Sequence, residues 1–340
     1  MKVGILTFHM AHNCGAMLQA YALCQSMTAV FSCDCLIIDY RLPEIYNKYK
    51  AMLQTNHVEP RRLKFDQYMK TALPLTEQVI SLSEVRPFDL YIIGSDQIWN
   101  PKITQGYKDA YFAKEFPSNS CCVSYAASTG TRIHDVREFA KRLERFKNVS
   151  VRESWLQNAL APFLPRGVTW CLDPVLLLGK KQWIAILKRP KRKHYILLFS
   201  FHMDENKYRS IEVTAEQQGL AIIELITHER GRRQRIVYED DYGPEEWLGY
   251  IKNASYIYTD SYHCALFAIL FDIKLCVLTH VHNENERISD ILYRLKLTRD
   301  ADGFFVATKQ TSQCLAAGKQ ISFNYLESVL KQAEYDKTEV

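Results

Sequence analysis

The sequence predicts an α/β fold in two domains, each built on a parallel sheet. The chain has 340 residues, which at about 150 residues per domain suggests two domains. Short apolar runs alternate with amphipathic helical patterns, as is typical of parallel sheets covered by helices. Hydrophobic residues make up 47% of the chain and charged residues 24%, a balance that supports packed cores and excludes a disordered or low-complexity protein.

The alternation of elements is clear in the first half of the chain. Strands are expected where short apolar runs occur, and helices where apolar side chains recur about every 3.6 residues. The expected strands cover 3–8, 35–40, 89–94, 122–127, 149–151 and 169–172. The expected helices begin at Ala16, cover 134–147 and begin again at Glu153, and Asp173-Pro174 ends the regular structure.

The second half repeats this rhythm. Strands are expected at 195–201, 221–226, 256–259 and 274–279, and helices at 205–218, 244–253, 262–271 and 288–295. The basic stretch 188–193 is predicted to be a solvated linker, with contact to acidic lipid headgroups as the alternative. We therefore expect two Rossmann-like domains, 1–180 and 194–310, that face each other across a cleft, followed by a helical segment at 311–340.

Charge and cysteine usage narrow the class of protein. A dedicated nucleic-acid binder of this size usually carries a larger or more clustered positive charge than the formal +5 of this chain. The ten cysteines include no C-x-x-C pair, so the usual zinc-ribbon and redox spacings are absent. The N-terminal apolar stretch is too short for a signal peptide, and the longest apolar run, 264–271, is far below the roughly 20 residues of a membrane span. The sequence predicts a cytoplasmic protein with reduced thiols.

Polar residues collect where predicted strands end, and α/β proteins bind ligands at the carboxyl ends of parallel strands. After the first strand, Asn13 leads to Gly15, which permits an anion to approach the helix N-terminus, although an ordinary turn has the same pattern. After the third strand, the run at 94–100 combines Trp99 with carboxylate and amide groups, as sugar sites do. The alternative is a capping cluster in which Asp96 caps a helix and Trp99 fills the core.

Two further strand ends carry charged residues. Arg152 follows a buried strand, so its guanidinium needs a partner, either an anionic substrate group or an internal carboxylate such as that of Glu153. After the strand at 256–259, Asp260 or Ser261 is expected to cap a helix and to leave His263 in its first turn. A histidine there can act as a general acid beside an anionic substrate; the alternative is a core histidine bonded to a carbonyl.

Several of these motifs occur in an order shared with one family. They are Asn13-x-Gly15-Ala16-x-Leu18-Gln19-Ala20-Tyr21, Gly94-Ser95-Asp96-Gln97-Ile98-Trp99-Asn100, Ser124-Tyr125-Ala126-Ala127-Ser128, Ser150-Val151-Arg152-Glu153, Leu172-Asp173-Pro174 and Thr259-Asp260-Ser261-Tyr262-His263. In this order they resemble the motifs of the polysaccharide pyruvyl transferase family. The resemblance extends from the first strand to about Leu297, which is nearly the whole chain.

The resemblance implies a GT-B-like fold and the transfer of a pyruvyl group from phosphoenolpyruvate to a sugar as a ketal. It implies that His263 is the general acid, and that Asp96 is a second catalytic residue that orients sugar hydroxyls with Gln97 and Asn100. Phosphoenolpyruvate is then a co-substrate, and no metal ion or redox cofactor is required. The other residues expected to bind substrate are Asn13, Gly15, Ser95, Trp99, Arg152, Asp260, Ser261 and Arg287.

Two positions differ from the family pattern. Cys264 stands where members often have glycine, and Ser261 stands where some branches carry an anion-binding arginine. The candidates to replace that arginine are Arg287 and the arginines at 230, 232, 233 and 235.

Two alternatives accompany the pyruvyl transferase prediction. One is a GT-B glycosyltransferase that uses a nucleotide sugar, and the other is a non-catalytic sugar-binding relative. The expected partners are phosphoenolpyruvate and a glycan or lipid-linked oligosaccharide, met at the cytoplasmic face of a membrane, and no nucleic acid.

Overall fold

The computed structural model describes all residues except 43–45, 48–50, 52–58, 228–230, 279–285 and 339–340. The chain divides into two compact units. Unit 1 comprises 1–50, 69–177 and 316–340, and unit 2 comprises 51–68 and 178–315. Both units are discontinuous in sequence, whereas the sequence analysis expected continuous domains at 1–180 and 194–310 and a separate segment at 311–340.

Unit 1 is built on a sheet of six parallel strands in the order β2-β1-β3-β4-β5-β6. The order reverses between β1 and β3, and such a reversal opens the crevice in which doubly wound sheets bind ligands. All six expected strands are present with small shifts at their ends. The strands are β1 (Lys2–Leu6), β2 (Asp34–Ile37), β3 (Leu90–Asp96), β4 (Cys122–Ala127), β5 (Val149–Val151) and β6 (Val168–Trp170).

The three helices expected in unit 1 are present as α1 (Cys14–Phe31), α5 (Val136–Arg142) and α6 (Ser154–Leu160), but α5 is shorter than expected. Helix α5 ends at Arg142 rather than near residue 147, because the Leu143 N–H donates to the Ala140 carbonyl and closes a tight last turn. The helices and short helical turns that lie wholly within the segments 1–50 and 69–177 are α1 (Cys14–Phe31), η1 (Leu82–Glu84), α4 (Pro101–Thr104), η2 (Asp109–Phe112), α5 (Val136–Arg142), α6 (Ser154–Leu160), η3 (Ala161–Phe163) and η4 (Pro174–Leu176).

Unit 2 contains a seven-stranded sheet in the order β12-β13-β11-β10-β7-β8-β9. The five strands from β11 to β9 are parallel, and the order of these five reverses between β7 and β10. Strands β9, β12 and β13 were not expected from the sequence. The strands are β7 (Tyr195–Phe199), β8 (Ala221–Leu225), β9 (Ile236–Glu239), β10 (Tyr256–Thr259), β11 (Lys274–Val277), β12 (Thr298–Arg299) and β13 (Phe305–Val306).

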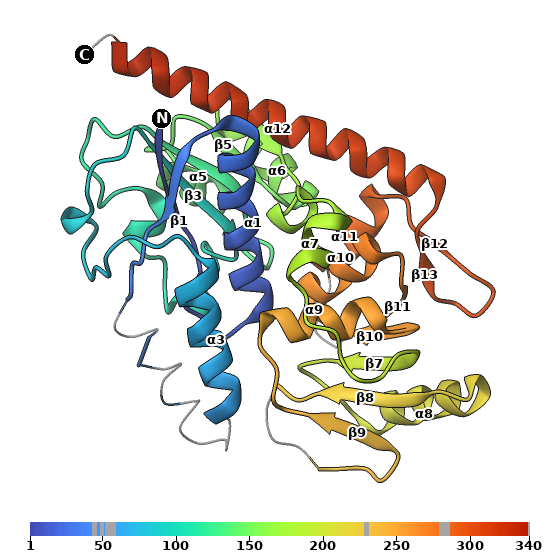
Figure 1. Ribbon diagram of the computed structural model, residues 1–340. Helices are drawn as coiled ribbons and strands as arrows, with labels where there is room; N and C mark the ends of the chain where they lie inside the picture. The colour runs from blue at the N-terminus through green and yellow to red at the C-terminus, as the bar shows by residue number, and fades with distance from the viewer. Residues whose placement is uncertain (43–45, 48–50, 52–58, 228–230, 279–285, 339–340) are drawn as a thin grey trace. The chain divides into compact units, whose positions relative to one another are not determined.

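Helices cover both faces of this sheet. Ile211 of α8 packs with Ile196 and Leu198 of β7 on one face. On the other face the Trp247 ring of α9 lies 5.5 Å from the Phe199 ring, since successive residues of a strand point to opposite faces. The helices are α7 (Lys180–Ile186), α8 (Glu205–Gln218), α9 (Pro244–Asn253), α10 (Tyr262–Phe271) and α11 (Glu286–Arg294), and Figure 1 shows α8 beside β8.

The basic stretch 188–193 lies inside unit 2 and does not link the units, because it falls within the segment 178–315 of that unit. The Lys188 N–H donates to the Glu245 carbonyl at 3.0 Å, and the Lys188 ammonium pairs with the Glu245 carboxylate. The start of this stretch is therefore fastened to α9, and a contact with lipid headgroups stays a prediction.

Two helices run from unit 2 into unit 1, namely α3 (Glu59–Ala72) and α12 (Lys309–Thr338). Figure 1 shows α12 as one continuous helix. In unit 1, Ser322 of α12 accepts a hydrogen bond from the Leu172 N–H at 2.9 Å, and the Tyr325 hydroxyl donates to the Ser124 carbonyl at 2.7 Å. In the described part of the chain, neither α12 nor any other helix is both long enough and apolar enough to cross a membrane.

Candidate active site

The loop after β1 leads into α1 through a helix cap. The Asn13 side chain accepts a hydrogen bond from the Ala16 N–H at 3.2 Å, which satisfies one of the free donors at the helix end. Gly15 is buried in the first turn of α1. The structure thus gives Asn13 a capping role, and its predicted contact with substrate stays a prediction.

Beside this loop, the β1 and β2 strand ends are joined by buried charges that the sequence analysis did not select. His9 Nε2 lies 2.9 Å from Asp39 Oδ1, and Arg41 Nε donates to the same oxygen at 2.8 Å. Burial acts to raise the pKa of Asp39, but the hydrogen bonds from His9 and Arg41 outweigh it and lower the pKa to about 2. This network holds the two strand ends together.

The loop after β3 is held by its own polar side chains. Asp96 has a left-handed backbone with a φ of 67°, and its Oδ1 accepts the Gln97 N–H at 2.8 Å. The Asn100 Nδ2 donates to Gln97 Oε1 at 2.8 Å, while Asn100 Oδ1 caps α4. Ser95 is buried, and its hydroxyl donates to the Ala126 carbonyl. The expected hydroxyl-orienting groups are therefore partly engaged in shaping the loop.

Trp99 is a core residue, and the prediction that it stacks on a sugar is wrong. Its side chain is completely buried, and its Nε1–H donates to the Tyr111 carbonyl at 2.8 Å. Its ring packs against Phe112, Phe139 and Phe146, with centroids 5.7 to 6.0 Å away. A ring enclosed in this way presents no face to a ligand.

Arg152 also points inward, and the structure assigns it to an internal charge network. Its Nη1 donates to Asp173 at 2.7 Å, its Nε to Glu153 at 3.2 Å and its Nη2 to Asp96 at 3.4 Å. The Arg152 side chain is fully buried and faces three carboxylates, so it has no surface to offer to phosphate or carboxylate groups of a substrate. Its expected role as a donor-binding residue is therefore corrected to positioning Asp96.

A cavity of about 420 Å³ lies between the loops that follow β3 and β4 in unit 1. It begins where Asn100 ends the β3 loop and is lined by Lys102, Arg132 and His134 among others. These residues were not predicted from the sequence because they lie beyond the strand-end motifs. Gly130, in the same β4 loop, has a left-handed φ of 72° that favours glycine, and a Cβ there would displace the Gln97 side chain, whose Oε1 would lie 2.0 Å away.

In unit 2, polar groups meet where the strand order reverses between β7 and β10. Asp260 follows β10, and its carboxylate accepts the Phe201 and His202 N–H groups of the β7 loop at 2.9 and 3.0 Å. The Ser200 hydroxyl donates to the same carboxylate at 2.9 Å. Asp260 thus fixes the β7 loop at the edge where doubly wound sheets bind ligands.

His202 is a functional candidate that the sequence analysis missed. Its Nδ1 lies 3.3 Å from Asp260 Oδ2, and 48% of its side chain is exposed. A carboxylate that orients an accessible imidazole is a common arrangement for proton transfer. The sequence feature that could have indicated His202 is its position three residues after the end of β7, one of the two strands between which the strand order reverses.

Helix α10 begins directly after Asp260 and Ser261, where the sequence predicted its start. Ser261 is the N-cap and accepts the Cys264 N–H at 3.4 Å, which leaves His263 in the first turn. His263 is largely buried, with 7% of its surface exposed, and its ring lies edge-on to Tyr262. Burial raises the pKa of the Cys264 thiol to about 12, so this thiol stays protonated at neutral pH.

Of the arginines proposed to replace an anion-binding residue at position 261, Arg287 lies near the site. Its guanidinium carbon is 5.4 Å from the centre of the Tyr262 ring. Arg233 pairs with Glu205 and Glu212 of α8, and Arg235 pairs with Glu216. Arg232 lies over the Tyr238 ring, and residue 230 lies outside the described residues.

A comparison with models of protein families shows to which family this chain belongs. The family model for polysaccharide pyruvyl transferases matches residues 13–283. The chain belongs to the polysaccharide pyruvyl transferase family. The matched range includes the loops after β3, β5, β7 and β10, and the family resemblance noted in the sequence is confirmed. A search of curated protein sequences gave no match.

Solved structures confirm the GT-B-like fold of this chain. A UDP-N-acetylglucosamine 2-epimerase superposes with a TM-score of 0.58 and 10% identity, covering 98% of this chain and 96% of that chain. The epimerase of Rickettsia bellii gives 0.52 and 13%, covering 98% and 97%. The epimerase of Neisseria meningitidis bound to UDP-N-acetylglucosamine gives 0.51 and 12%, covering 98% and 94%. At these identities the similarity shows the fold alone.

The predicted site residues fall into two sets. Asn13, Gly15, Ser95, Asp96, Gln97, Trp99, Asn100 and Arg152 belong to unit 1, and Asp260, Ser261, His263 and Arg287 belong to unit 2. The cleft in which the two sets would face each other stays a prediction. Among the described residues, no three His, Cys, Asp or Glu side chains are grouped as metal ligands.

Proposed function

We propose that this family member takes the pyruvyl group from phosphoenolpyruvate and joins it to two hydroxyls of one sugar as a ketal. Family membership supports the transferred group and a polysaccharide acceptor. The observation that carries the donor assignment is the position of His263 in the first turn of α10, with Arg287 beside Tyr262. A helix N-terminus and an arginine favour a multiply charged anion, and the histidine can supply a proton.

The proposed reaction balances without a change in oxidation state. The methylene carbon of phosphoenolpyruvate gains a proton, and the adjacent carbon becomes electrophilic. One sugar hydroxyl attacks that carbon, and the second hydroxyl then forms the other C–O bond as the C–O bond to phosphate breaks. The two hydroxyls lose two protons; one replaces the proton given to the methylene carbon, and the other leaves with inorganic phosphate.

The described residues of unit 2 suit the proton transfers. His263 is the proposed donor to the methylene carbon. His202, held by Asp260, is the proposed acceptor of a hydroxyl proton, because nearly half of its side chain is exposed. Positioning two hydroxyls of one sugar against a single carbon can supply a large part of the rate enhancement.

The acceptor sugar is proposed to bind in unit 1. The 420 Å³ cavity after β3 and β4 carries Lys102, Arg132 and His134 on its wall and adjoins Asn100. Its size falls within the range of about 300–1,000 Å³ that is usual for ligand pockets. A lipid-linked glycan met at the cytoplasmic face of a membrane remains the proposed source of the acceptor.

The test measures donor binding first and transfer second. Calorimetric titration is expected to show binding of phosphoenolpyruvate and none of uridine diphosphate, and phosphate release is expected only when a suitable glycan is added. His263→Asn is expected to lower phosphate release by roughly 100-fold or more. His194→Asn, an exposed histidine of unit 2, is the matched control and is expected to keep full activity.

Two results would contradict this function. Binding of uridine diphosphate without phosphoenolpyruvate would favour a glycosyltransferase that uses a nucleotide sugar. Absence of binding by either compound, in a protein that melts cooperatively, would favour a non-catalytic sugar-binding relative.

A further inference from the structure

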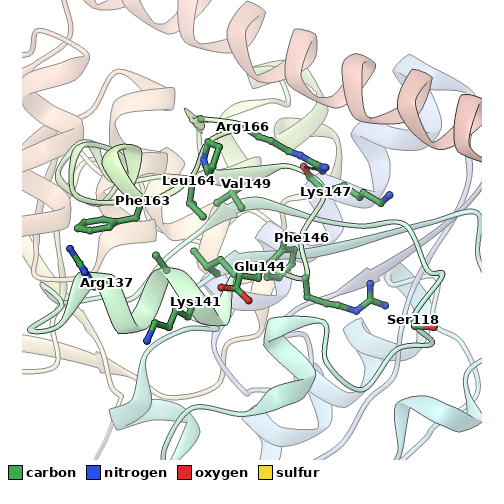
Figure 2. Close-up of a pocket in the computed structure, with 15 residues that line it drawn as sticks. Ser118, Arg137, Lys141, Glu144, Phe146, Lys147, Val149, Phe163, Leu164 and Arg166 are labelled. Carbon is green, nitrogen blue, oxygen red and sulfur yellow. Dashed lines mark hydrogen bonds between the residues drawn. The ribbon is translucent and has the colours of Figure 1, made fainter.

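A second cavity lies at the opposite edge of the unit 1 sheet, at the amino ends of β5 and β6. It measures about 720 Å³ and is lined by α5, by the segment that enters β5 and by 163–167, which precedes β6. This edge is remote from the carboxyl strand ends that carry the motifs. Figure 2 shows the residues that line it.

Positive charge is concentrated on the wall of this cavity. Five basic side chains line it against one carboxylate, that of Glu144; the five are Arg137, Lys141, Arg145, Lys147 and Arg166. The whole chain carries a formal charge of only +5, so an excess of four positive charges in one cavity is a local feature. Such an excess attracts anions by a field focused in a concave surface.

Three of these cations are available to a ligand. Within the described ranges, Arg137, Arg145 and Arg166 pair with no carboxylate; Arg145 and Arg166 donate only to the carbonyls of Pro117 and Lys147. By contrast, Lys141 lies 3.1 Å from Glu138, and Lys147 lies 3.6 Å from Asp336. An anion would therefore find three guanidinium groups without a competing internal carboxylate.

The cations stand in two groups, and Leu164, Val149 and the carboxylate of Glu144 lie between them. In Figure 2, Arg137 and Lys141 lie on one side of the cavity, and Lys147 and Arg166 lie on the other. The Phe163 ring lies on the Arg137 side, its centre 5.9 Å from the guanidinium carbon. This pattern fits a ligand whose negative charges are separated by uncharged rings with apolar faces.

We propose that this cavity binds an acidic oligosaccharide, with carboxylates on the two cation groups and sugar rings over Phe163 and Leu164. The inference rests on the proposed function, because every pyruvyl ketal adds one carboxylate to the glycan. The ligand class is thus a glycan that already carries pyruvyl ketals on other sugars of its chain, which this cavity would bind. The concave wall favours a single chain over the flat surface of a bilayer.

The test compares two variants that lose the same charge. Arg137→Ala, Arg145→Ala and Arg166→Ala are combined in one variant, and Lys191→Ala, Arg192→Ala and Lys193→Ala, exposed residues of unit 2, form the matched control. The probes are a tetramer of galacturonic acid and a neutral tetramer of glucose, titrated by calorimetry. The cavity variant is expected to bind the acidic probe at least tenfold more weakly, and the control variant within about twofold of the natural chain.

Several outcomes would overturn the proposal. They are equal affinity for the neutral and acidic probes, an equal loss in the control variant, or cavity-dependent binding to phosphatidylglycerol vesicles with no affinity for the acidic tetramer. Arg166→Glu alone, at an exposed position, is the second variant and replaces the triple variant if that variant does not fold. It is expected to weaken binding of the acidic tetramer. Phosphoenolpyruvate binding is measured in parallel. If the natural chain does not bind phosphoenolpyruvate, the proposed function is contradicted, whereas the binding of the acidic tetramer still tests the cavity by itself.

Discussion

Arg152 shows how a single buried residue can organise a strand-end cluster. Its guanidinium contacts Asp96 from the β3 loop, Glu153 from its own loop and Asp173 from the loop after β6. Three loops that are far apart in sequence are therefore held by one cation. The nature of this residue as arginine matters because its planar fork can contact several carboxylates at once.

Removal of this cation is expected to destabilise the fold. Arg152→Ala leaves three carboxylates without their shared partner, and breaking a buried ion pair costs about 3–5 kcal/mol of unfolding free energy. Urea denaturation at neutral pH measures this loss. Arg166→Ala, at an exposed arginine of the same unit, is the control and is expected to change stability by less than about 0.5 kcal/mol. Equal stability of the two variants would contradict the assignment of Arg152 to an internal network.

The lowered pKa of Asp39 predicts that the stability of the fold depends on pH in the acid range. A carboxyl group whose pKa falls from 3.8 to about 2 on folding stabilises the folded state above its ordinary pKa, and this contribution disappears as the pH falls to about 2. The shift corresponds to about 2 kcal/mol. Asp39→Asn is expected to lose that amount at pH 7 and to approach the natural chain between about pH 4 and pH 2. Urea denaturation at each pH measures the difference in unfolding free energy between Asp39→Asn and the natural chain. A difference that stays constant from about pH 4 to about pH 2 would contradict the prediction.

At the scale of elements, helix α9 illustrates a conflict between local preference and packing. Gly249 lies inside this helix, where alanine would be preferred by about 1 kcal/mol in isolation. A Cβ at this position, however, would stand 1.8 Å from the Lys188 carbonyl oxygen, which belongs to the backbone that leads into β7. The close approach of these two segments therefore requires glycine.

Gly249→Ala is expected to destabilise the protein by about 1–3 kcal/mol, because a backbone segment must move to relieve the overlap. Gly231→Ala is the matched control, since an added Cβ meets no atom within 4 Å there. Thermal unfolding followed by circular dichroism compares the two variants. A stabilised Gly249→Ala variant would mean that helix preference outweighs the contact with Lys188.

The accuracy of the sequence predictions also differed between elements for physical reasons. Helices such as 205–218, 244–253 and 262–271 have the predicted bounds because capping residues and apolar periodicity are local signals. Strand β9 and helix α3 were missed, since β9 is mostly half-buried and α3 is rich in charged residues, so neither has a strong apolar pattern.

At the scale of the whole molecule, the C-terminal helix completes a unit whose strands come from the first half of the chain. Leu326 and Val329 of α12 are fully buried, while Ile321 of the same helix is exposed. The bonds from Ser322 and Tyr325 to Leu172 and Ser124 fasten α12 to β4 and the loop after β6. A helical segment at 311–340 was expected, but its place in unit 1 was not.

Leu326→Ala is therefore expected to cost about 2–5 kcal/mol of unfolding free energy, as is usual for a leucine removed from a packed core. Ile321→Ala on the same helix is the control and is expected to cost less than about 1 kcal/mol. Differential scanning calorimetry of both variants tests whether α12 stabilises unit 1. An unchanged transition for Leu326→Ala would show that the helix is dispensable for the fold.

The sequence by itself determined the alternation of strands and helices, a helix capped by Asp260 or Ser261, and the ordered motifs that mark the family, because these signals lie within short stretches. Only the tertiary structure decided that Trp99 and Arg152 point inward, that His202 joins Asp260 and that five cations share one cavity. Burial and charge pairing depend on residues such as Phe146 and Asp173, which folding brings together from distant positions. A polar motif at a strand end therefore indicates where a site is expected, whereas packing decides which of its side chains can reach a ligand.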